Sequence, residues 1–491
     1  MNYVSTRGKS AKTTSAIAIK KGIAEDGGLY MPETIPTVDI DFIESLIPLS
    51  YEERAVKVLS LLLTDYTKEE LTNASEFAYG GGKFDTFPAP CVKLDNDINV
   101  LELWHGPTAA FKDMALQICP TLLSTALVKT DEKGDAFILV ATSGDTGKAA
   151  LEGYKDVPKT KIMVFYPQNG VSTVQKLQMA TQEGSNVSVC AINGCFDDAQ
   201  TGVKKIFADA EMRKKLSENG KFFSSANSIN WGRLAPQIVY YFSAYCDMIK
   251  SGRITMGDKI NVTVPTGNFG NIFAGFIART MGLPINKFIC ASNKNNILTD
   301  FINTGVYDRN REFYLTMSPS MDILISSNLE RYLYLITDSE TVSGYMKELS
   351  ENGKYAVSES VLAKIQSSFV GKYCDEENTA KTIRETYGKN GYLSDTHTAV
   401  AIYGAREYIA ETGDKTPMLV VSTASPYKFA DNVYFALTGK KSKDSLSALD
   451  DLSKLTNVKI PKPLSGIGER KVRFTKSIEP CDMAKAVIEE L

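Results

Sequence analysis

The chain has 491 residues, of which 43% are hydrophobic and 23% are charged. Such a length favours two or three domains, and these proportions are typical of a globular protein rather than a disordered or membrane-embedded one. The 55 Lys and Arg residues nearly balance 58 Asp and Glu residues, so the net charge of -3 offers no positive field for nucleic acid. We expect neither nucleic acid nor a membrane as a partner.

The start of the chain and its rarer residues limit the options further. Residues 1–10 lack the apolar core of a secretory signal, and the apolar stretch Val58–Leu63 is far shorter than a membrane span, so a cytoplasmic location is expected. The eight cysteines include no C-x-x-C pair, and two histidines, His105 and His397, cannot form an H-E-x-x-H site. No metal is expected, and an enzyme of this sequence needs a reactive group other than histidine.

The N-terminal region alternates short helical patterns with turns. Apolar spacing predicts helices over Thr13–Gly22, Tyr51–Leu63 and Glu69–Tyr79, which we interpret as a cap domain over residues 1–95. Next, Pro88–Leu94 and Ile98–Trp104 are strand-like, and the Asp-Asn-Asp between them predicts a hairpin.

Beyond the hairpin the pattern becomes strand and helix in alternation. Continuous apolar runs separated by helices are typical of parallel strands covered on both faces, so the sequence predicts an α/β protein with two sheets. We expect a smaller α/β domain over residues 96–225 and a larger one over 226–491. The predicted strands are 136–141, 161–166, 187–192, 260–264, 288–291 and 417–421, and the later helices are 358–371, 376–387 and 398–409.

Four loops contain candidate reactive or binding residues. The first is H-G-P-T-A-A-F-K-D at His105–Asp113, and it includes Lys112. A lysine at the start of a helix lies in the positive end of the helix dipole, which lowers the pKa of its amine and suits it to imine chemistry. The alternative is a solvated surface lysine, the usual state of this residue.

The second loop, Thr142–Gly147, follows a buried strand and opens a helix at Lys148. Backbone amides at a helix N-terminus, with the hydroxyls of Ser143 and Thr146 beside them, suit a carboxylate. A plain capping turn is the alternative, and the spacing is not that of a Walker loop.

The third loop, Pro265–Asn271, follows strand 260–264 and precedes a helix over Ile272–Met281. Gly267 and Gly270, three apart, let the backbone turn and present N–H groups to a phosphate. A tight turn without a ligand is the alternative, and the spacing is not a dinucleotide fingerprint.

The fourth segment, Ser225–Arg233, joins a short strand to a long helix through Ile249. Ser228 and Asn230 offer hydrogen-bond donors and Arg233 a cationic fork, which suits a second phosphate. The alternative is a capped helix with a surface arginine.

Together these segments resemble threonine synthase, in the branch of fungal and enteric-bacterial enzymes. The motifs that carry the resemblance span nearly the whole chain: Tyr3–Gly8, Gly27–Pro32, His105–Asp113, Thr142–Gly147, Asn227–Arg233, Gly267–Asn271 and Asp395–Val400.

The resemblance implies a lyase with the tryptophan-synthase-β-like fold that binds pyridoxal phosphate (PLP) between two α/β domains. Lys112 matches the Schiff-base lysine, Gly267, Asn268, Phe269, Gly270 and Asn271 match the cofactor-phosphate loop, and Thr423 matches the hydroxyl residue at the pyridine nitrogen. The substrate O-phosphohomoserine is then expected at Thr142, Ser143, Asp145, Thr146, Ser228, Asn230 and Arg233. Members of this branch are often monomers.

Two positions depart from the pattern. Asp145 stands where many relatives of the wider fold have Asn, and Pro120 falls inside the helix expected from Lys112, which must end early or kink there.

The expected reaction converts O-phosphohomoserine and water into threonine and phosphate, with Lys112 as general base and Arg233, Asn230 and Ser228 facing the leaving phosphate. A PLP-dependent dehydratase or a threonine-synthase-like phospho-lyase is the alternative enzyme. A relative of the fold that only binds a ligand requires a lost lysine or a broken phosphate loop, and both are present here.

Overall fold

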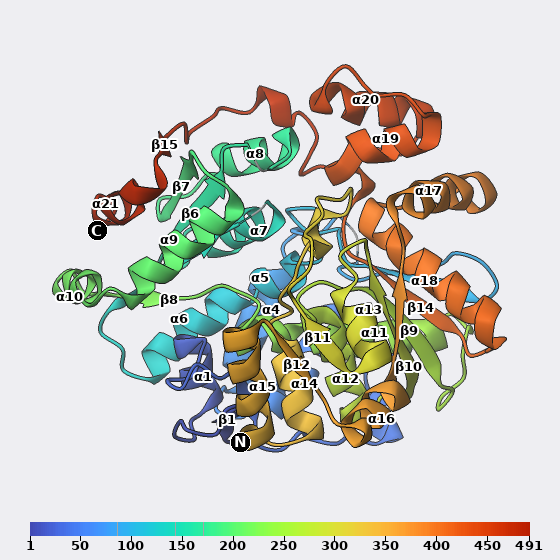
Figure 1. Cartoon of the computed structure of the whole chain (residues 1–491), viewed down its shortest axis with the longest axis horizontal. Coiled ribbons are helices and arrows are strands. Elements are labelled where there is room, and N and C mark those ends of the chain that lie inside the picture. The colour runs from blue at the N-terminus through green and yellow to red at the C-terminus, as the bar shows by residue number, and fades with distance from the viewer. Residues whose placement is uncertain (86, 143, 170) are drawn as a thin grey trace.

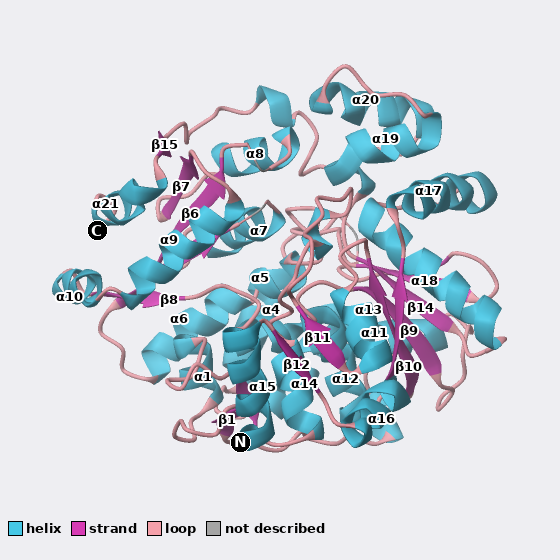
Figure 2. Cartoon of the chain, in the orientation of Figure 1, coloured by secondary structure: helices cyan, strands magenta, loops and turns pink. Residues whose placement is uncertain are grey.

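Two separate β-sheets organise the protein, and the computed structural model describes residues 1–85, 87–142, 144–169 and 171–491. The first sheet has six strands in the order β13-β10-β9-β14-β4-β3, all parallel except β3. Figure 2 shows its strands β9, β10 and β14 apart from β6 and β7 of the second sheet. The second has five parallel strands in the order β15-β7-β6-β5-β8. The predicted α/β class with two sheets is therefore confirmed. The strands of the first sheet are β3 (Cys91–Lys93), β4 (Ile98–Glu102), β9 (Ile260–Pro265), β10 (Ile285–Ser292), β13 (Phe369–Tyr373) and β14 (Met418–Ser422), and those of the second are β5 (Asp135–Ala141), β6 (Thr160–Pro167), β7 (Val187–Ile192), β8 (Lys221–Ser224) and β15 (Ser477–Ile478).

Helices cover both faces of the second sheet because its central strands carry apolar side chains on both faces. Phe137 and Leu139 of β5 pack with apolar residues of α9, α10 and α21, whereas Ile138 and Val140 join the large core that contains α6 and α7. This division follows from the alternation of side chains along a strand. The bounds are α6 (Cys119–Lys129), α7 (Asp145–Tyr154), α8 (Thr173–Ala180), α9 (Phe196–Ala208), α10 (Ala210–Glu218) and α21 (Met483–Ile488).

The first sheet is covered in the same way. Val100 and Val420 pack with α18, while Val262 and Val421 face the core that holds α11 and α12. The bounds of the helices around this sheet are α11 (Trp231–Lys250), α12 (Gly270–Met281), α13 (Ile297–Thr304), α14 (Leu329–Ile336), α15 (Ser339–Asn352), α16 (Glu359–Ser368), α17 (Glu376–Asn390), α18 (Thr396–Thr412), α19 (Ala430–Thr438) and α20 (Ser445–Thr456).

The N-terminal region contains the helices expected there. Ser50 and Thr67 begin two of them with capping boxes, in which the side chain of a glutamate three residues later bonds back to the cap. Strands β1 and β2 form a short antiparallel pair, in which Tyr3 lies opposite Pro32. The bounds are β1 (Tyr3–Ser5), α1 (Ser15–Lys21), β2 (Tyr30–Pro32), α2 (Ile40–Glu44), α3 (Tyr51–Leu62) and α4 (Lys68–Tyr79), and a second short pair is β11 (Val306–Asp308) with β12 (Lys354–Ala356).

Some predicted bounds were wrong. The helix predicted over 358–371 ends at Ser368, because Phe369–Tyr373, which begins with the strand-favouring residues Phe369 and Val370, pairs with β10. The helix expected at Lys148 already begins at Asp145. The helix from Lys112 is a single turn, α5 (Asp113–Leu116), and Pro120 lies in the first turn of α6, where its missing N–H costs nothing.

The predicted hairpin is confirmed, since β3 and β4 pair antiparallel, and it belongs to the first sheet beside β14. The C-terminal segment (red in Figure 1) runs from α20 across to α21, and its strand β15 pairs with β7 of the second sheet. Each sheet thus contains strands from distant parts of the sequence. The domain bounds expected from sequence stay a prediction.

Candidate active site

Lys112 lies in the loop between β4 and α5, and the end of β14 holds that loop in place. The N–H of Phe111 donates to the carbonyl of Thr423 over 2.8 Å, and the N–H of Ser425 donates to the carbonyl of Ala109 over 3.0 Å. Thr423, which is more than 300 positions later in the sequence, therefore lies beside the segment that contains Lys112. Both strands end at the same edge of the sheet, where parallel strands present their loops.

The surroundings of Lys112 favour its neutral amine. Its side chain is 11% exposed, and its Nζ lies 3.8 Å from Oδ2 of Asp145. Burial lowers the pKa of the Lys112 amine; Asp145 opposes this, and the cations Lys428 and Arg233 lower the pKa further. The sequence attributed a low pKa to the helix dipole, but α5 has only four residues and burial is the main cause.

The second loop places Asp145 at the first position of α7. The hydroxyl of Thr142 accepts hydrogen bonds from the N–H groups of Gly144 and Gly147, at 3.0 and 2.9 Å. Two backbone donors of this loop are thus already bonded within it. Thr146 is half-buried in the first turn of the helix, and Ser143 lies outside the described residues.

Lys428 and Gln175 belong to this site, and sequence reasoning missed both. Lys428 Nζ lies 2.8 Å from Oδ1 of Asp145 and 3.0 Å from the carbonyl oxygen of Thr108, and its side chain is fully buried. The Gln175 amide donates to the same Asp145 oxygen over 2.9 Å. Although burial raises the pKa of the Asp145 carboxyl, Lys428, Lys112 and Gln175 outweigh burial and hold that pKa below its ordinary value. A lysine among the apolar residues after β14 was the one available signal for Lys428.

The third loop joins β9 to α12, which begins at Gly270. The sequence predicted that the two glycines make the turn, but the residue in the left-handed region is Phe269, with φ of 60°. Gly267 is required for another reason: a Cβ there would lie 2.8 Å from the carbonyl oxygen of Ser320. At Gly270 the nearest atom to such a Cβ is the Asn328 amide nitrogen at 3.4 Å.

Hydrogen bonds to Asn268 and Asn271 hold this loop in place. The N–H of Asn328 donates to the carbonyl of Asn268 over 3.0 Å. Tyr240 and Tyr241 donate to Oδ1 of Asn271 over 2.8 and 2.6 Å. The Asn271 amide nitrogen is buried and has no hydrogen-bond partner within the described part of the chain, so a donor is available at the start of α12.

Ser320 joins the second and third loops. Its carbonyl packs against Gly267, and its hydroxyl donates to Oδ2 of Asp145 over 3.4 Å. The same Asp145 oxygen lies near Lys112. The structure therefore brings the first three predicted loops to one place between the two sheets.

The fourth segment contributes Arg233, which is 4% exposed in the first turn of α11. One guanidinium nitrogen donates to the carbonyl of Ala226, while Nε is buried without a partner among the described residues. Burial lowers the pKa of this guanidinium.

Asn230 and Ser228 differ from Arg233 in their surroundings. Asn230 caps α11 by accepting from the N–H of Gly232, and its amide donates to the carbonyls of Ile19 and Ser225, at 2.9 and 3.1 Å. The structure thus gives Asn230 a structural role, and its predicted substrate contact stays a prediction. Ser228 is half-buried in the turn before the helix.

The charges of this site favour an anionic ligand. The cations Lys428 and Arg233 both act on Lys112; Lys428 is paired with the Asp145 carboxylate, whereas Arg233 has no carboxylate partner among the described residues. Asp113 accepts from the N–H and hydroxyl of Thr108, and burial raises its pKa to about 6. Excess positive charge and unpaired buried donors are stabilised by phosphate or carboxylate groups.

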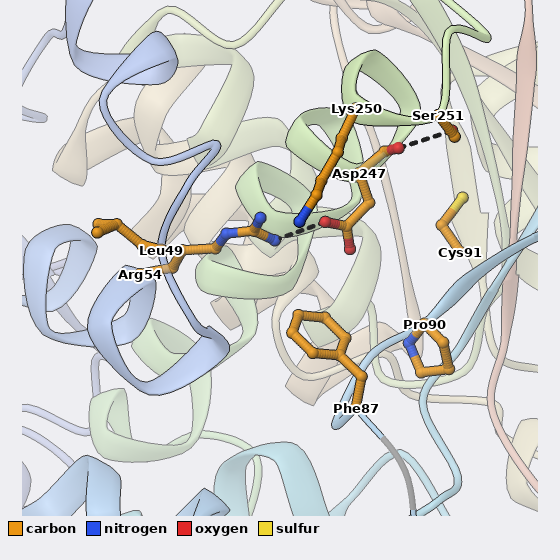
Figure 3. Close-up of a pocket in the computed structure, with 8 residues that line it drawn as sticks. All are labelled: Leu49, Arg54, Phe87, Pro90, Cys91, Asp247, Lys250 and Ser251. Carbon is orange, nitrogen blue, oxygen red and sulfur yellow. Dashed lines mark hydrogen bonds and ion pairs between the residues drawn. The ribbon is translucent and has the colours of Figure 1, made fainter.

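A pocket of about 340 Å³ lies elsewhere, between α3 and the C-terminal end of α11 (Figure 3). The ion pair of Arg54 with Asp247, 2.8 Å long, forms one wall, and Phe87 and Lys250 line it beside them. It contains none of the predicted site residues. Among the helices that the structure describes, none is both long and apolar enough to cross a lipid bilayer.

Two sheets that meet at a buried lysine, with the loop of residues 265–271 at the start of a helix, define an α/β fold also seen in a PLP-bound enzyme. A solved threonine synthase from Brucella melitensis, described as PLP-bound, has this fold with a TM-score of 0.89, 38% identity, and coverage of 100% of this chain and 99% of that chain. The threonine synthase from yeast has a TM-score of 0.89 and 33% identity, and the match covers 100% of this chain and 98% of that chain.

The chain belongs to the threonine synthase family. Residues 2–79 match the model "Threonine synthase N terminus", and residues 398–488 match "Threonine synthase, C-terminal". The threonine synthase of Pseudomonas aeruginosa is 38% identical over 90% of this chain and 91% of its own length. Human "Threonine synthase-like 1" is 40% identical over 88% of this chain, and the match spans 59% of the human protein.

Proposed function

We propose that the protein is a PLP-dependent threonine synthase, which converts O-phospho-L-homoserine and water into L-threonine and phosphate. The observation that carries the proposal is the buried Lys112 with the buried cation Arg233 near it, because the reaction needs a neutral amine and places for two phosphates and a carboxylate. Membership of the threonine synthase family and the fold shared with a PLP-bound member support it.

The residues present fit the cofactor. Lys112 would hold PLP covalently, the amides of residues 267–271 and the Asn271 side chain would bind its phosphate, and Thr423 would meet the ring nitrogen. The unpaired Asn271 amide at the start of α12 supports the phosphate assignment, since helix N-termini bind anions. Bound PLP withdraws electrons from the α carbon of an amino acid and so eases loss of its proton.

The substrate would be held at both ends. We propose that its carboxylate binds the second loop, through Thr142, Ser143, Asp145 and Thr146. Its phosphate would bind Arg233, with Ser228 and Asn230 alongside. Arg233 has a buried, unpaired Nε, and a cation there stabilises the charge that develops on the departing phosphate.

Lys112 would transfer the protons of the reaction. A neutral amine accepts the α proton and returns protons to the substrate carbons, which is general acid–base catalysis by one positioned group. Phosphate leaves from the γ carbon, and water adds at the β carbon. A cytoplasmic, monomeric enzyme remains our expectation, and size-exclusion chromatography tests the oligomeric state.

A second candidate is a phospho-lyase, which yields 2-oxobutyrate, ammonia and phosphate from the same substrate and water. It is considered because the relatives include "Threonine synthase-like 1" proteins as well as threonine synthases. Both reactions use the same lysine, so they differ only in whether water adds at the β carbon before the product leaves.

Product analysis separates the two candidates. Purified protein is incubated with PLP and O-phosphohomoserine, and threonine, 2-oxobutyrate and phosphate are measured together. Threonine equal to phosphate supports the synthase, and 2-oxobutyrate equal to phosphate supports the lyase. The matched control is Lys112→Ala, which should release no phosphate. Phosphate release by that variant at the wild-type rate would overturn the role of Lys112.

A further inference from the structure

A fully buried ion pair joins the two sheets beside Lys112. Lys428 lies in the short helical turn Pro426–Phe429 after β14, whereas Asp145 begins α7 after β5 of the other sheet. Their Nζ and Oδ1 atoms are 2.8 Å apart, and their side chains are 0% and 3% exposed. Lys428 also donates to the carbonyl of Thr108, in the loop that carries Lys112.

The two oxygens of Asp145 have different partners. Oδ1 accepts from Lys428 and from Gln175, at 2.8 and 2.9 Å. Oδ2 accepts from the Ser320 hydroxyl at 3.4 Å and lies 3.8 Å from Nζ of Lys112, which is beyond hydrogen-bond distance. Lys428, rather than Lys112, is therefore the lysine bonded to this carboxylate.

We propose that Lys428 is a positioning residue, which binds the Asp145 carboxylate so that the Lys112 amine stays free to take and return protons. The proposal rests on the role given to Lys112 under the proposed function. It assigns no contact of Lys428 with the substrate.

The charges around Lys112 give the physical reason. The charged groups that act on Lys112 are the carboxylates Asp145 and Asp113 and the cations Lys428 and Arg233. An opposite charge within about 4–6 Å favours the charged form of a lysine, and a like charge disfavours it. Lys428 therefore acts in two ways: it occupies the Asp145 carboxylate, which would otherwise bind a Lys112 ammonium, and its own charge disfavours that ammonium. Without Lys428, a larger fraction of Lys112 is protonated at neutral pH and cannot accept a proton.

The test measures the Lys112 amine directly. Full-length protein freed of PLP is treated with formaldehyde and cyanoborohydride, which methylate neutral amines, and the Lys112 peptide is quantified by mass spectrometry across pH. We expect Lys428→Met to slow labelling at neutral pH by about tenfold, the factor for one pKa unit, and to shift the labelling midpoint to higher pH. Asp145→Asn should speed labelling at neutral pH and shift the labelling midpoint to lower pH.

The double variant Lys428→Met/Asp145→Asn separates charge from structural damage. With both charges gone, labelling should return to within about threefold of the wild-type rate, since the two effects oppose each other. This variant leaves neither charge of the Lys428–Asp145 pair without its partner, so it serves where Lys428→Met alone does not fold. In that case Asp145→Asn is compared with the double variant, which should label more slowly if the Lys428 charge acts on Lys112.

Two results overturn the proposal. The first is a folded Lys428→Met protein with the wild-type labelling midpoint. The second is an identical midpoint for Asp145→Asn and the double variant. Because labelling uses no O-phosphohomoserine, a chain that shows the expected pattern but makes no threonine contradicts only the proposed function. One that makes threonine with unchanged labelling contradicts only the role of Lys428.

Discussion

The backbone N–H of Ser320 donates a hydrogen bond to Nε2 of His397 over 3.1 Å. Because that nitrogen must accept, the proton of the neutral imidazole lies on Nδ1, which is 3.1 Å from Oδ1 of Asp395. His397 is 1% exposed, and the Ser320 that it holds lies against both Gly267 and Asp145. One buried histidine thus holds the turn at Ser320, which lies between the loop of residues 265–271 and the site around Lys112.

His397→Phe should therefore impair activity without removing the cofactor. The change leaves the N–H of the half-buried Ser320 without its acceptor, at a cost of about 1 kcal/mol in the free energy of unfolding. We expect kcat/KM for O-phosphohomoserine to fall by roughly tenfold, because the turn around Ser320 loosens. Urea unfolding and steady-state kinetics measure the two effects. A variant as stable and active as the wild type would show that the bond positions nothing.

Gly270→Asp should abolish retention of PLP, with the fold intact. The backbone at Gly270 has no positive φ, and an added Cβ meets the Asn328 amide only at 3.4 Å, so a side chain is accommodated. Its carboxylate would repel a phosphate at the start of α12. Gly270→Ala, which adds the Cβ without the charge, is the matched control and should keep PLP. Absorbance after dialysis measures the bound cofactor, and equal retention by both variants would contradict the assignment.

Much of this site was predictable because its parts lie directly after strands. Buried strands are visible as continuous apolar runs, so the loops after 260–264 and 136–141 were each expected to hold chemistry at the end of a strand. Lys112 and Thr423 were predicted separately, and the bond from Phe111 to Thr423 shows that they share a site.

The remaining partners were not predictable because only tertiary structure brings them together. Ser320 reaches Asp145 across 175 positions of sequence, and Lys428 follows a strand of the other sheet. Local patterns also failed at 369–373, where pairing with β10 turns the end of a helical pattern into a strand. Propensity cannot anticipate such a contact, since packing overrides it.

Asp113 should make stability fall as pH rises through the acidic range. Burial raises the pKa of its carboxyl from 3.8 to about 6, so the folded state holds a proton that the unfolded state has already lost. The stability contributed by the protonated form is complete below about pH 4 and is lost by about pH 6, a change of up to about 3 kcal/mol. In Asp113→Asn this group cannot titrate, so its unfolding free energy should not show this fall between about pH 4 and pH 6. The difference in unfolding free energy between the two proteins should therefore change in favour of the variant between about pH 4 and pH 7. A constant difference would contradict the assignment.

Arg54 should be a major source of stability far from the site. Its guanidinium donates to the carbonyls of Leu46, Ile47 and Ser243 and to the Ser243 hydroxyl. It also donates to Asp247, as Figure 3 shows. Arg54→Met leaves these acceptors unpaired, and the loss of one partner of a buried pair costs about 3–5 kcal/mol. The control Lys57→Met removes an exposed cation from the same helix and should cost less than about 0.5 kcal/mol. Urea unfolding compares them, and equal costs would contradict the role of Arg54.

Arg233 is the residue whose removal best tests substrate choice, because many reactions share a PLP lysine and few release a phosphate. Arg233→Ala should lower kcat/KM for O-phosphohomoserine by roughly 30- to 1,000-fold, the loss of about 2 to 4 kcal/mol of charge-assisted binding. PLP should remain bound, since residues 267–271 are assigned to its phosphate. Cofactor absorbance is therefore measured on the same samples as turnover.

The outcomes of this experiment separate three roles for Arg233. Loss of activity with PLP retained supports the phosphate contact. Loss of PLP and activity together would mean that Arg233 serves the cofactor or the fold, where it already bonds to the carbonyl of Ala226. Wild-type turnover would remove it from the site, and the partner of the substrate phosphate would then be sought among the N-terminal cations. Of these, Arg7 already pairs with Glu330 at 3.1 Å, whereas Lys9 is exposed, so Lys9→Ala would be the next variant to assay.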